Sequence, residues 1–132
     1  MRRSEAAAFY RHYLATGNAH AFDRLSDFVA EDVRVNDEVQ GLPAYVAGLR
    51  EVVRAFPDYQ WRLQGLLIDG ASIAAHFIDT GTHRGEFMGV APTGRSVRTR
   101  EFSVYHLKDG RLAEVWVTAG NLSILDQLRD AG

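Results

Sequence analysis

The sequence predicts an α+β fold, with helices in the first half of the chain and an antiparallel sheet in the second. Apolar residues recur at helical spacing up to about residue 56 and alternate as in strands from about residue 59 onwards. Turn signals such as Asp69-Gly70 and Asp109-Gly110 separate the later segments, which favours antiparallel hairpins. Helices that precede the strands, instead of alternating with them, are typical of this class. The 132 residues contain no repeat and fit one domain over 1–132.

Three helices and one short strand are expected in the first half: a helix between Ser4 and Gly17-Asn18, a helix over 21–29, a strand over 32–39 and a helix over 44–56. Ser4 is a favourable N-cap, and the Gly17-Asn18 pair is a stop signal. Pro43 lies near the start of the third helix, where its missing N–H group costs nothing, and Pro57-Asp58 ends that helix.

Four strands and a closing helix are expected in the second half, over 59–68, 72–83, 97–107, 111–119 and 121–132. The third of these strands is flanked by two turn signals, Pro92-Thr93-Gly94 and Asp109-Gly110. In the closing segment leucines recur at positions 122, 125 and 128, which is the spacing of one helix face.

The composition excludes several classes of protein. Fifteen Lys and Arg against seventeen Asp and Glu give a net charge of −2, so we expect no nucleic-acid partner. No apolar run reaches the ~20 residues of a membrane span, and the N-terminus does not have the apolar core of a signal peptide, so a cytoplasmic protein is expected. The chain has no cysteine, and its five histidines are not spaced with carboxylates as metal ligands, so no metal site is expected.

Several runs resemble the SnoaL-like polyketide cyclase family of the nuclear transport factor 2-like (NTF2-like) superfamily. They are HFIDTGTHRGEFMGVAPTGRSV, YHLKDGRLAEVW, NLSILDQL, Phe56-Pro57-Asp58 and Gly41. The resemblance covers roughly residues 9 to 128. It implies a cone-shaped α+β barrel, in which a curved, mostly antiparallel sheet wraps over the N-terminal helices around a deep pocket. It also implies aldol-type acid/base chemistry, without a cofactor, on a polyketide or another hydrophobic carbonyl compound.

The sequence departs from the family at one catalytic position. Members usually carry an acid/base Asp just after the Trp of the last strand, whereas Trp116 is followed here by VTAGN, with no carboxylate. The His that assists in some members falls near Ser103. A ligand-binding protein without catalysis is therefore the main alternative to a cyclase. An epoxide hydrolase or a hydroxylation partner on the same scaffold is the third.

Strand alternation gives the candidate pocket face. With 108–111 as the hairpin tip, Leu107 faces Leu112, and one face carries Glu101, Ser103, Tyr105, Glu114, Trp116 and Thr118. Following the family, this face is assigned to the pocket. A slip of one residue would reverse the partnership of the two strands.

Glu101 is the first candidate base, because a carboxylate in an apolar cavity has a raised pKa. The alternative is that it pairs with Arg100 or Arg62. His76, whose ordinary pKa lies near neutrality, and Asp37 are the other catalytic candidates. The expected substrate-binding residues are Trp116, Tyr105, Ser103, Thr118, Asn36, Tyr10 and Tyr45.

The apolar residues on the opposite face of the same strands indicate that another protein chain covers this face. Phe102 and Val104, with Val115 and Val117 beside them, would form an exposed apolar patch on the sheet. Monomers rarely leave such a patch uncovered. We therefore expect a homodimer through this face, as is common in the superfamily, in addition to the hydrophobic small-molecule ligand.

Overall fold

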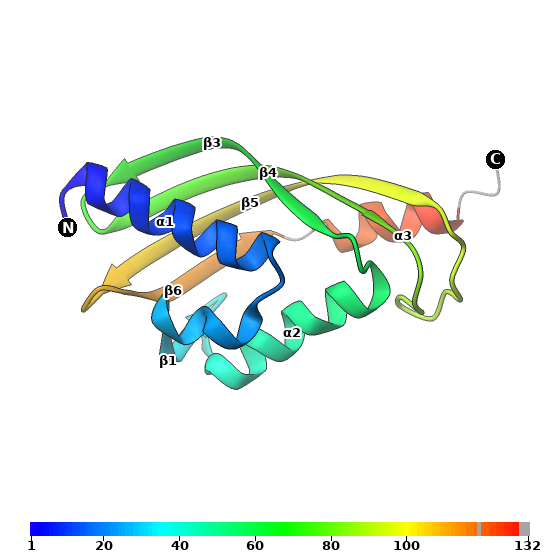
Figure 1. Ribbon diagram of the computed structural model, residues 1–132, viewed down its shortest axis with the longest axis horizontal. Helices are drawn as coiled ribbons and strands as arrows, with labels where there is room; N and C mark the ends of the chain where they lie inside the picture. Colours follow the sequence, from blue (N-terminus) through cyan, green and yellow to red (C-terminus); the bar gives the residue numbers. More distant parts are fainter. Residues whose placement is uncertain (119, 130–132) are drawn as a thin grey trace.

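The computed structural model describes residues 1–118 and 120–129 (Figure 1). Its elements are, in chain order, α1 (Arg3–Asn18), the 3₁₀ helix η1 (Phe22–Asp27), β1 (Val29–Val35), β2 (Glu38–Val39), α2 (Leu42–Ala55), β3 (Gln60–Asp69), β4 (Ser72–Thr82), β5 (Ser96–Lys108), β6 (Arg111–Thr118) and α3 (Asn121–Arg129). The predicted α+β class is confirmed, with the helices α1 and α2 ahead of the main strands.

The six strands form one sheet in the order β2-β1-β6-β5-β4-β3. Only β1 and β6 run parallel among these pairs, so the sheet is mostly antiparallel as predicted. The sheet is strongly curved but does not close, because β2 and β3 remain as its two edges. The long pairing of β4 with β5 forms its centre.

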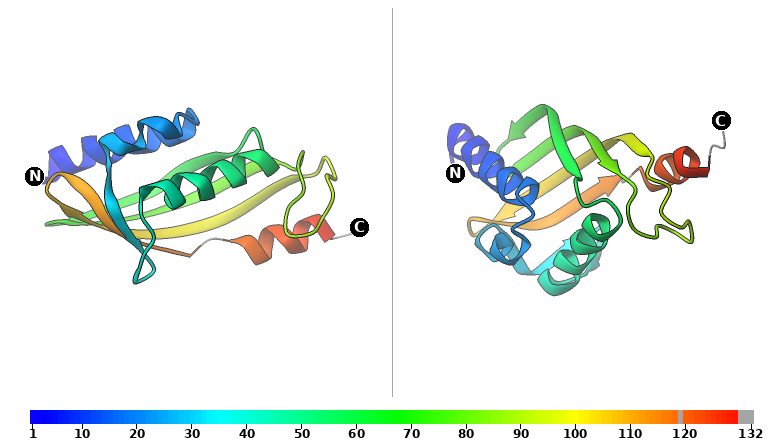
Figure 2. Two further views of the ribbon diagram at one scale, coloured as in Figure 1. Left: turned by 90° about the horizontal axis from the view of Figure 1, so that it is seen from below. Right: turned by 45° about the vertical axis from the view of Figure 1, so that its right-hand side comes forward.

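Helices α1 and α2 lie on the concave side of the sheet, and α3 lies beyond one end of it (Figure 2). The main core fills the space between α1 and the sheet, where Tyr10, Ile73 and Leu112 are fully buried. A second cluster joins α3 to the end of α2 through Ile124, Leu128 and Phe56. Between the two clusters, the middle of the concave side contains a cavity.

The helices predicted around α1, α2 and α3 are found within a few residues, and the strand predicted over 32–39 is confirmed only in part, because its residues form two strands and not one continuous strand. This segment is a hairpin of β1 and β2, because Asn36 and Asp37 adopt left-handed conformations with φ of 50° and 73° and reverse the chain between Val35 and Glu38. Two such residues in a row are what a tight hairpin turn requires. The segment expected as a second α-helix is η1. The ends of the last predicted strand and helix, at 119 and 130–132, lie outside the described residues.

The register of β5 and β6 differs from the predicted one beyond the hairpin tip. Leu107 faces Leu112 as predicted, but the next pair is His106 with Glu114, because a bulge leaves Ala113 without a partner. An extra residue moves every later side chain to the other face of the sheet. The prediction that Trp116 shares the face of Glu101 is therefore wrong.

The segment that follows β4 is anchored against the end of α2. The N–H groups of Arg84 and Gly85 both donate to the carbonyl oxygen of Ala55, at 2.9 and 3.0 Å. The fully buried His83 accepts a hydrogen bond at Nδ1 from the N–H group of Thr93, at 3.1 Å. The GTHRGEF run thus has a structural role here, in which it fastens the 83–95 loop.

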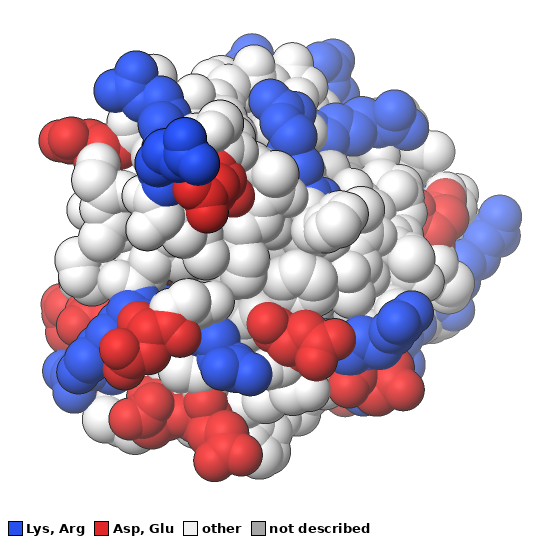
Figure 3. All heavy atoms as spheres, turned by 60° about the vertical axis from the view of Figure 1, so that its left-hand side comes forward, with Lys and Arg blue, Asp and Glu red and all other residues white. Residues whose placement is uncertain are grey.

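Charge is not concentrated in one sign on the face drawn in Figure 3. Lys and Arg gather along its upper edge, both signs mix along its lower edge, and uncharged atoms form a broad band between them. Within residues 1–118 and 120–129, no helix is long and apolar enough to cross a membrane.

Candidate active site

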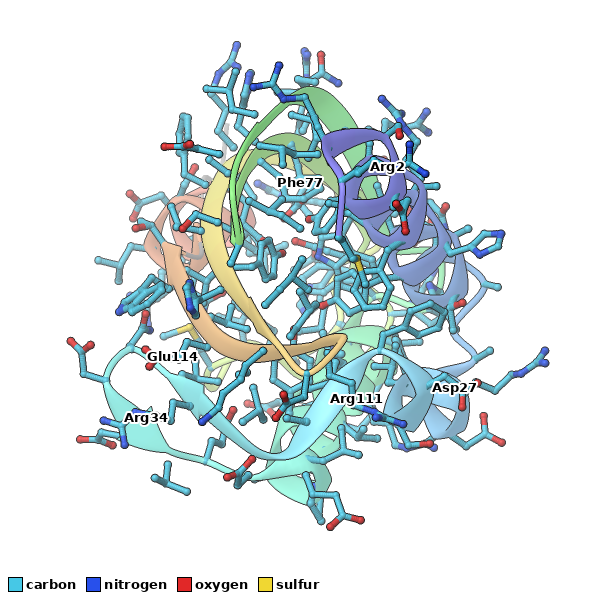
Figure 4. All side chains as sticks on the ribbon, turned by 90° about the vertical axis from the view of Figure 1, so that its left-hand side faces the viewer. Arg2, Asp27, Arg34, Phe77, Arg111 and Glu114 are labelled. Atoms are coloured by element: carbon cyan, nitrogen blue, oxygen red, sulfur yellow. The ribbon has the colours of Figure 1, made fainter. Side chains whose placement is uncertain are left out.

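A cavity of about 400 Å³ lies between the concave face of the sheet and the two long helices. Its walls are largely aromatic, with contributions from Tyr10, Tyr13, Tyr45, Trp61 and Phe77. Figure 4 looks along the curved sheet and shows Phe77 inside the curve, with Glu114 and Arg34 outside it. A cavity of this size and character is suited to a hydrophobic small molecule.

Glu101 is the one cavity-lining residue, among those that the structure describes, whose side chain is a carboxyl or a basic group. It comes from β5 and faces the concave side next to Phe77 of β4. Asp79, two residues along β4 from Phe77, points to the same side, and its carboxyl lies close enough to that of Glu101 for the two to interact. The hydroxyl of Ser103 donates a long hydrogen bond of 3.4 Å to Oε2 of Glu101.

Asp79 is 1% exposed and is not among the described residues that line the cavity. Its Oδ2 accepts a hydrogen bond of 3.0 Å from the hydroxyl of Tyr59. Its Oδ1 is buried without a donor among the described residues. None of the ion pairs within the described part of the chain includes either carboxyl. The site therefore contains two carboxyls in contact and no cation paired with them.

Burial raises the pKa of Glu101 to about 9, and the hydrogen bond and negative charge of Asp79 act in the same direction. Burial also raises the pKa of Asp79, although the hydrogen bonds from Glu101 and Tyr59 oppose this. Both shifts arise because an ionised carboxylate is poorly solvated in this apolar environment. At neutral pH Glu101 is therefore protonated.

Four tyrosine hydroxyls form two pairs at the helical side of the cavity. The hydroxyl of Tyr10 donates to that of Tyr105 at 3.0 Å, and the hydroxyls of Tyr13 and Tyr45 form a second hydrogen bond. Burial raises the pKa of Tyr45 to about 12 and those of the other three well above the ordinary value. These hydroxyls keep their protons at neutral pH, and the accepting hydroxyl of each pair, such as that of Tyr105, can donate its own proton to a ligand oxygen.

The predicted site residues divide into two groups. Five of them line the cavity: Glu101, Ser103, Tyr105, Tyr10 and Tyr45. The other five lie outside the cavity lining: His76, Asp37, Asn36, Trp116 and Thr118. The bulge at Ala113 explains why Trp116 and Thr118 do not line the cavity, because it places them on the outer face with Val104 and Phe102.

The residues outside the cavity make structural contacts. Asn36 accepts a hydrogen bond of 3.0 Å at Oδ1 from the N–H group of Val117, and Trp116 donates through Nε1 to Oδ1 of Asp37 at 2.9 Å. Together they fasten the β1–β2 hairpin to β6. His76 stacks on Phe102 on the outer face, with ring centroids 5.8 Å apart.

The expected alternative partners of Glu101 also lie on the outer face. Arg100 and Arg62 both flank Ile78 there, and the Nε of Arg62 donates to Oγ1 of Thr80 at 3.4 Å. Because Glu101 points to the concave side, neither guanidinium shares its surroundings. The prediction of such an ion pair is wrong.

Sequence reasoning missed Asp79, Tyr13 and Tyr59. Asp79 lies two residues from Phe77, so strand alternation alone places both on one face. His76, which was preferred as the functional residue of β4, lies on the opposite face of this strand from Asp79. Tyr13 lies one helical turn from Tyr10, and that spacing was the available signal.

A curved sheet folded over helices around a deep apolar cavity defines the cone-shaped α+β proteins of the NTF2-like superfamily. A family model described as SnoaL-like polyketide cyclase matches residues 6–128. The chain belongs to this family.

Solved structures support the same assignment. A SnoaL-like polyketide cyclase from Agrobacterium tumefaciens is 29% identical, with a TM-score of 0.80 and coverage of 91% of this chain and 94% of that one. AclR from Streptomyces galilaeus, described as a proposed hydroxylase, is 25% identical, with a TM-score of 0.85 and coverage of 95% and 81%. IdmH from Streptomyces antibioticus, a proposed polyketide cyclase, shares the fold at 23% identity, with a TM-score of 0.83 and coverage of 92% and 96%. No curated protein matches the chain.

Within residues 1–118 and 120–129, no group of three His, Cys, Asp or Glu residues is arranged to hold a metal ion. The side chains at the cavity supply one carboxyl pair and a set of neutral hydroxyls.

Proposed function

We propose that the protein is an acid/base enzyme of the polyketide-cyclase type, acting without a cofactor on an uncharged, hydrophobic carbonyl compound. The observation that carries this proposal is the carboxyl of Glu101 in an aromatic cavity, with its pKa raised to about 9. At neutral pH such a carboxyl can donate its proton, and it accepts one from a substrate once its own proton has passed to the neighbouring carboxyl or to solvent. Cytoplasmic secondary metabolism is the proposed setting, on the strength of the family alone.

The proposed reaction is an intramolecular aldol addition. Glu101 takes a proton from the carbon next to one carbonyl, and tyrosine hydroxyls such as that of Tyr105 stabilise the enolate oxygen. The enolate carbon then attacks a second carbonyl of the same molecule, and the new alkoxide takes a proton back from Glu101. The aromatic walls hold the chain folded so that the two carbons meet.

Proton exchange tests the proposal without knowledge of the natural substrate. In deuterated buffer near pH 7.5, the protein should accelerate the exchange of the protons next to the carbonyl of 1-tetralone, as followed by NMR. Glu101→Gln should reduce this acceleration at least about 100-fold, which is the usual contribution of a general base. His76→Gln is the matched control, since it lies on the outer face. Binding of 1-tetralone without any acceleration would contradict the proposal.

A ligand-binding protein without catalysis is the second candidate. It is favoured by the lack of a carboxylate in the stretch that follows Trp116. At Gly120 a Cβ atom would lie 2.0 Å from Oγ1 of Thr99, so no side chain fits there without rearrangement. This candidate predicts binding of 1-tetralone with no acceleration of proton exchange.

A water-activating hydrolase ranks below both of these candidates, because no Arg lies among the described residues that line the cavity.

We also propose that the protein is a homodimer through the outer face of the sheet. The exposed apolar side chains there are Leu67, Val104 and Phe102, which are 75%, 43% and 54% exposed. Val115 and Val117, which the sequence had placed in this patch, point into the cavity instead.

The placement of charge around the patch is compatible with a second copy as the partner. Arg62 and Arg100 lie at one end of the patch, and Asp69 and Glu114 lie at the other, where Arg34 is paired with Glu114 in the sheet. A two-fold axis through the patch brings Arg62 and Arg100 of each copy over the end of the other copy that carries Asp69 and Glu114.

Light scattering during gel filtration should give the mass of two chains at micromolar concentration. Val104→Glu should give one chain, because each copy would bury the new charge against its partner. Leu122→Glu, on the exposed side of α3, is the control and should leave the mass unchanged. A single-chain mass for the unaltered protein would overturn this proposal.

A further inference from the structure

We infer that Asp79 is a positioning residue for Glu101: the two carboxyls share one proton, and Asp79 takes up the proton of Glu101 when Glu101 accepts one from the substrate. The proton transfer to substrate rests on the proposed function, whereas the shared proton rests on the structure of the site.

The placement of the two carboxyls differs in one decisive respect. Glu101 lines the cavity, while Asp79 does not and is 1% exposed. They come from adjacent strands, where Phe77 pairs with Glu101 and Asp79 pairs with Thr99, so the two side chains are diagonal neighbours on the concave face. A ligand in the cavity can touch Glu101, whereas Asp79 is not among the described residues that line the cavity.

The hydrogen bonds around Asp79 require a proton between the carboxyls. Its Oδ2 is paired with the hydroxyl of Tyr59, but its buried Oδ1 has no donor among the described residues. Two ionised carboxylates cannot hydrogen-bond to each other, since both only accept. A proton on Glu101, donated to Oδ1, gives this oxygen its partner and removes one of two buried negative charges.

The location of the proton follows from the surroundings of each group. Asp79 keeps the charge because the Tyr59 hydroxyl donates to it at 3.0 Å. From the described residues Glu101 receives only the 3.4 Å bond from Ser103, and its raised pKa agrees with its holding the proton. Across neutral pH the pair then carries one proton and one negative charge.

This arrangement lets a protonated carboxyl act as a base. The proton that leaves the substrate carbon binds the oxygen of Glu101 that is not bonded to Asp79, while the proton already on Glu101 moves to Oδ1 of Asp79. The substrate becomes an enolate, and both carboxyls are then neutral. After ring closure, Glu101 gives its proton to the alkoxide and Asp79 returns the other proton to Glu101. No proton is gained or lost over the cycle.

Asp79→Asn is the critical variant, because asparagine can still accept a hydrogen bond from Glu101 but holds no charge and takes up no proton. Carboxyl carbon NMR should show Glu101 of the unaltered protein titrating near pH 9. In the variant, loss of the neighbouring charge should lower this pKa by at least one unit. At pH 6, where most of Glu101 keeps its proton in both proteins, exchange of 1-tetralone protons should lose at least about 100-fold in kcat with KM little changed. Asp69→Asn, which removes an exposed carboxyl at the end of β3, should change neither measurement.

The outcomes separate this inference from the proposed function. An ordinary titration of Glu101 near pH 4.5, or one unaltered by Asp79→Asn, overturns the shared proton whatever the activity. Full exchange activity in Asp79→Asn, with loss in Glu101→Gln, overturns the relay and leaves the proposed function standing. No exchange activity in the unaltered protein, together with the expected titrations, overturns the proposed function and supports the shared proton.

Tyr59→Phe provides a second variant if Asp79→Asn does not fold. Without the Tyr59 hydroxyl the charge on Asp79 is less stabilised, so the lower of the two titrations should move to higher pH. An unchanged lower titration would overturn the assignment of the charge to Asp79.

Discussion

Replacing Glu101 with glutamine should stabilise the folded protein, and the gain should grow as the pH rises from about 5 to 9. In the unfolded chain Glu101 loses its proton near its ordinary pKa of 4.5, whereas in the folded protein burial raises this pKa to about 9. Between these values the folded state binds more protons than the unfolded state, so its stability falls as the pH rises. Glutamine has no proton to lose and can still donate a hydrogen bond to Asp79.

The expected size is on the order of 2 kcal/mol between pH 6 and pH 8, since each unit of pH within this window is worth up to about 1.4 kcal/mol. Urea unfolding at pH 5, 6, 7, 8 and 9 measures the effect. Glu38→Gln, at an exposed position of β2, is the control and should follow the unaltered protein. If the unfolding free energies of Glu101→Gln and of the unaltered protein changed in parallel from pH 5 to pH 9, the pKa of Glu101 would be the same in the folded and unfolded protein, which would contradict this prediction.

Gly85→Ala should cost about 3 kcal/mol of unfolding free energy. A Cβ atom at this position would lie 2.5 Å from the carbonyl oxygen of Arg54 and 3.1 Å from the Cα of Ala55. These are backbone atoms at the end of α2, and they cannot rotate away as a side chain can. The loop must therefore move, which stretches the bonds from Arg84 and Gly85 to the Ala55 carbonyl.

Gly48→Ala is the matched control for this substitution. Gly48 lies within α2, and apart from its chain neighbours and the nearby backbone of α2 no described atom lies within 4 Å of its would-be Cβ. Alanine favours a helix over glycine by up to about 1 kcal/mol, so the control should unfold at an equal or higher urea concentration. If Gly85→Ala unfolded at the same urea concentration as the unaltered protein, the close packing of the loop on α2 would be refuted.

The order of elements was predictable because it depends on local patterns. Helical spacing defined α1 and α2, and Asp-Gly pairs marked the hairpins of the second half. The β1–β2 hairpin was missed because Asn36-Asp37 is a weaker turn signal than a pair that ends in glycine.

The faces of the strands were only partly predictable. Alternation along β5 was right, since Glu101, Ser103 and Tyr105 all line the cavity. Alternation was not enough to predict which residues of β6 share a face with Glu101 of β5. The bulge at Ala113 depends on packing between the strands, and no local sequence signal indicates it. The partnership of Glu101 with Asp79 required the pairing of β4 with β5, which is also a non-local property.

The bulge at Ala113 also bears on how this scaffold can diverge. If Ala113 were instead paired with His106, so that the ladder had no bulge, the rest of β6 would present its other face, with Trp116 and Glu114 toward the cavity and Val115 and Val117 toward the outer surface. One shift of register would thus change both the ligand that fits inside and the surface offered to a neighbour outside, with no substitution at either place. In a family with this architecture, the position of a bulge near a hairpin end is a route to new specificity that residue-by-residue comparison overlooks.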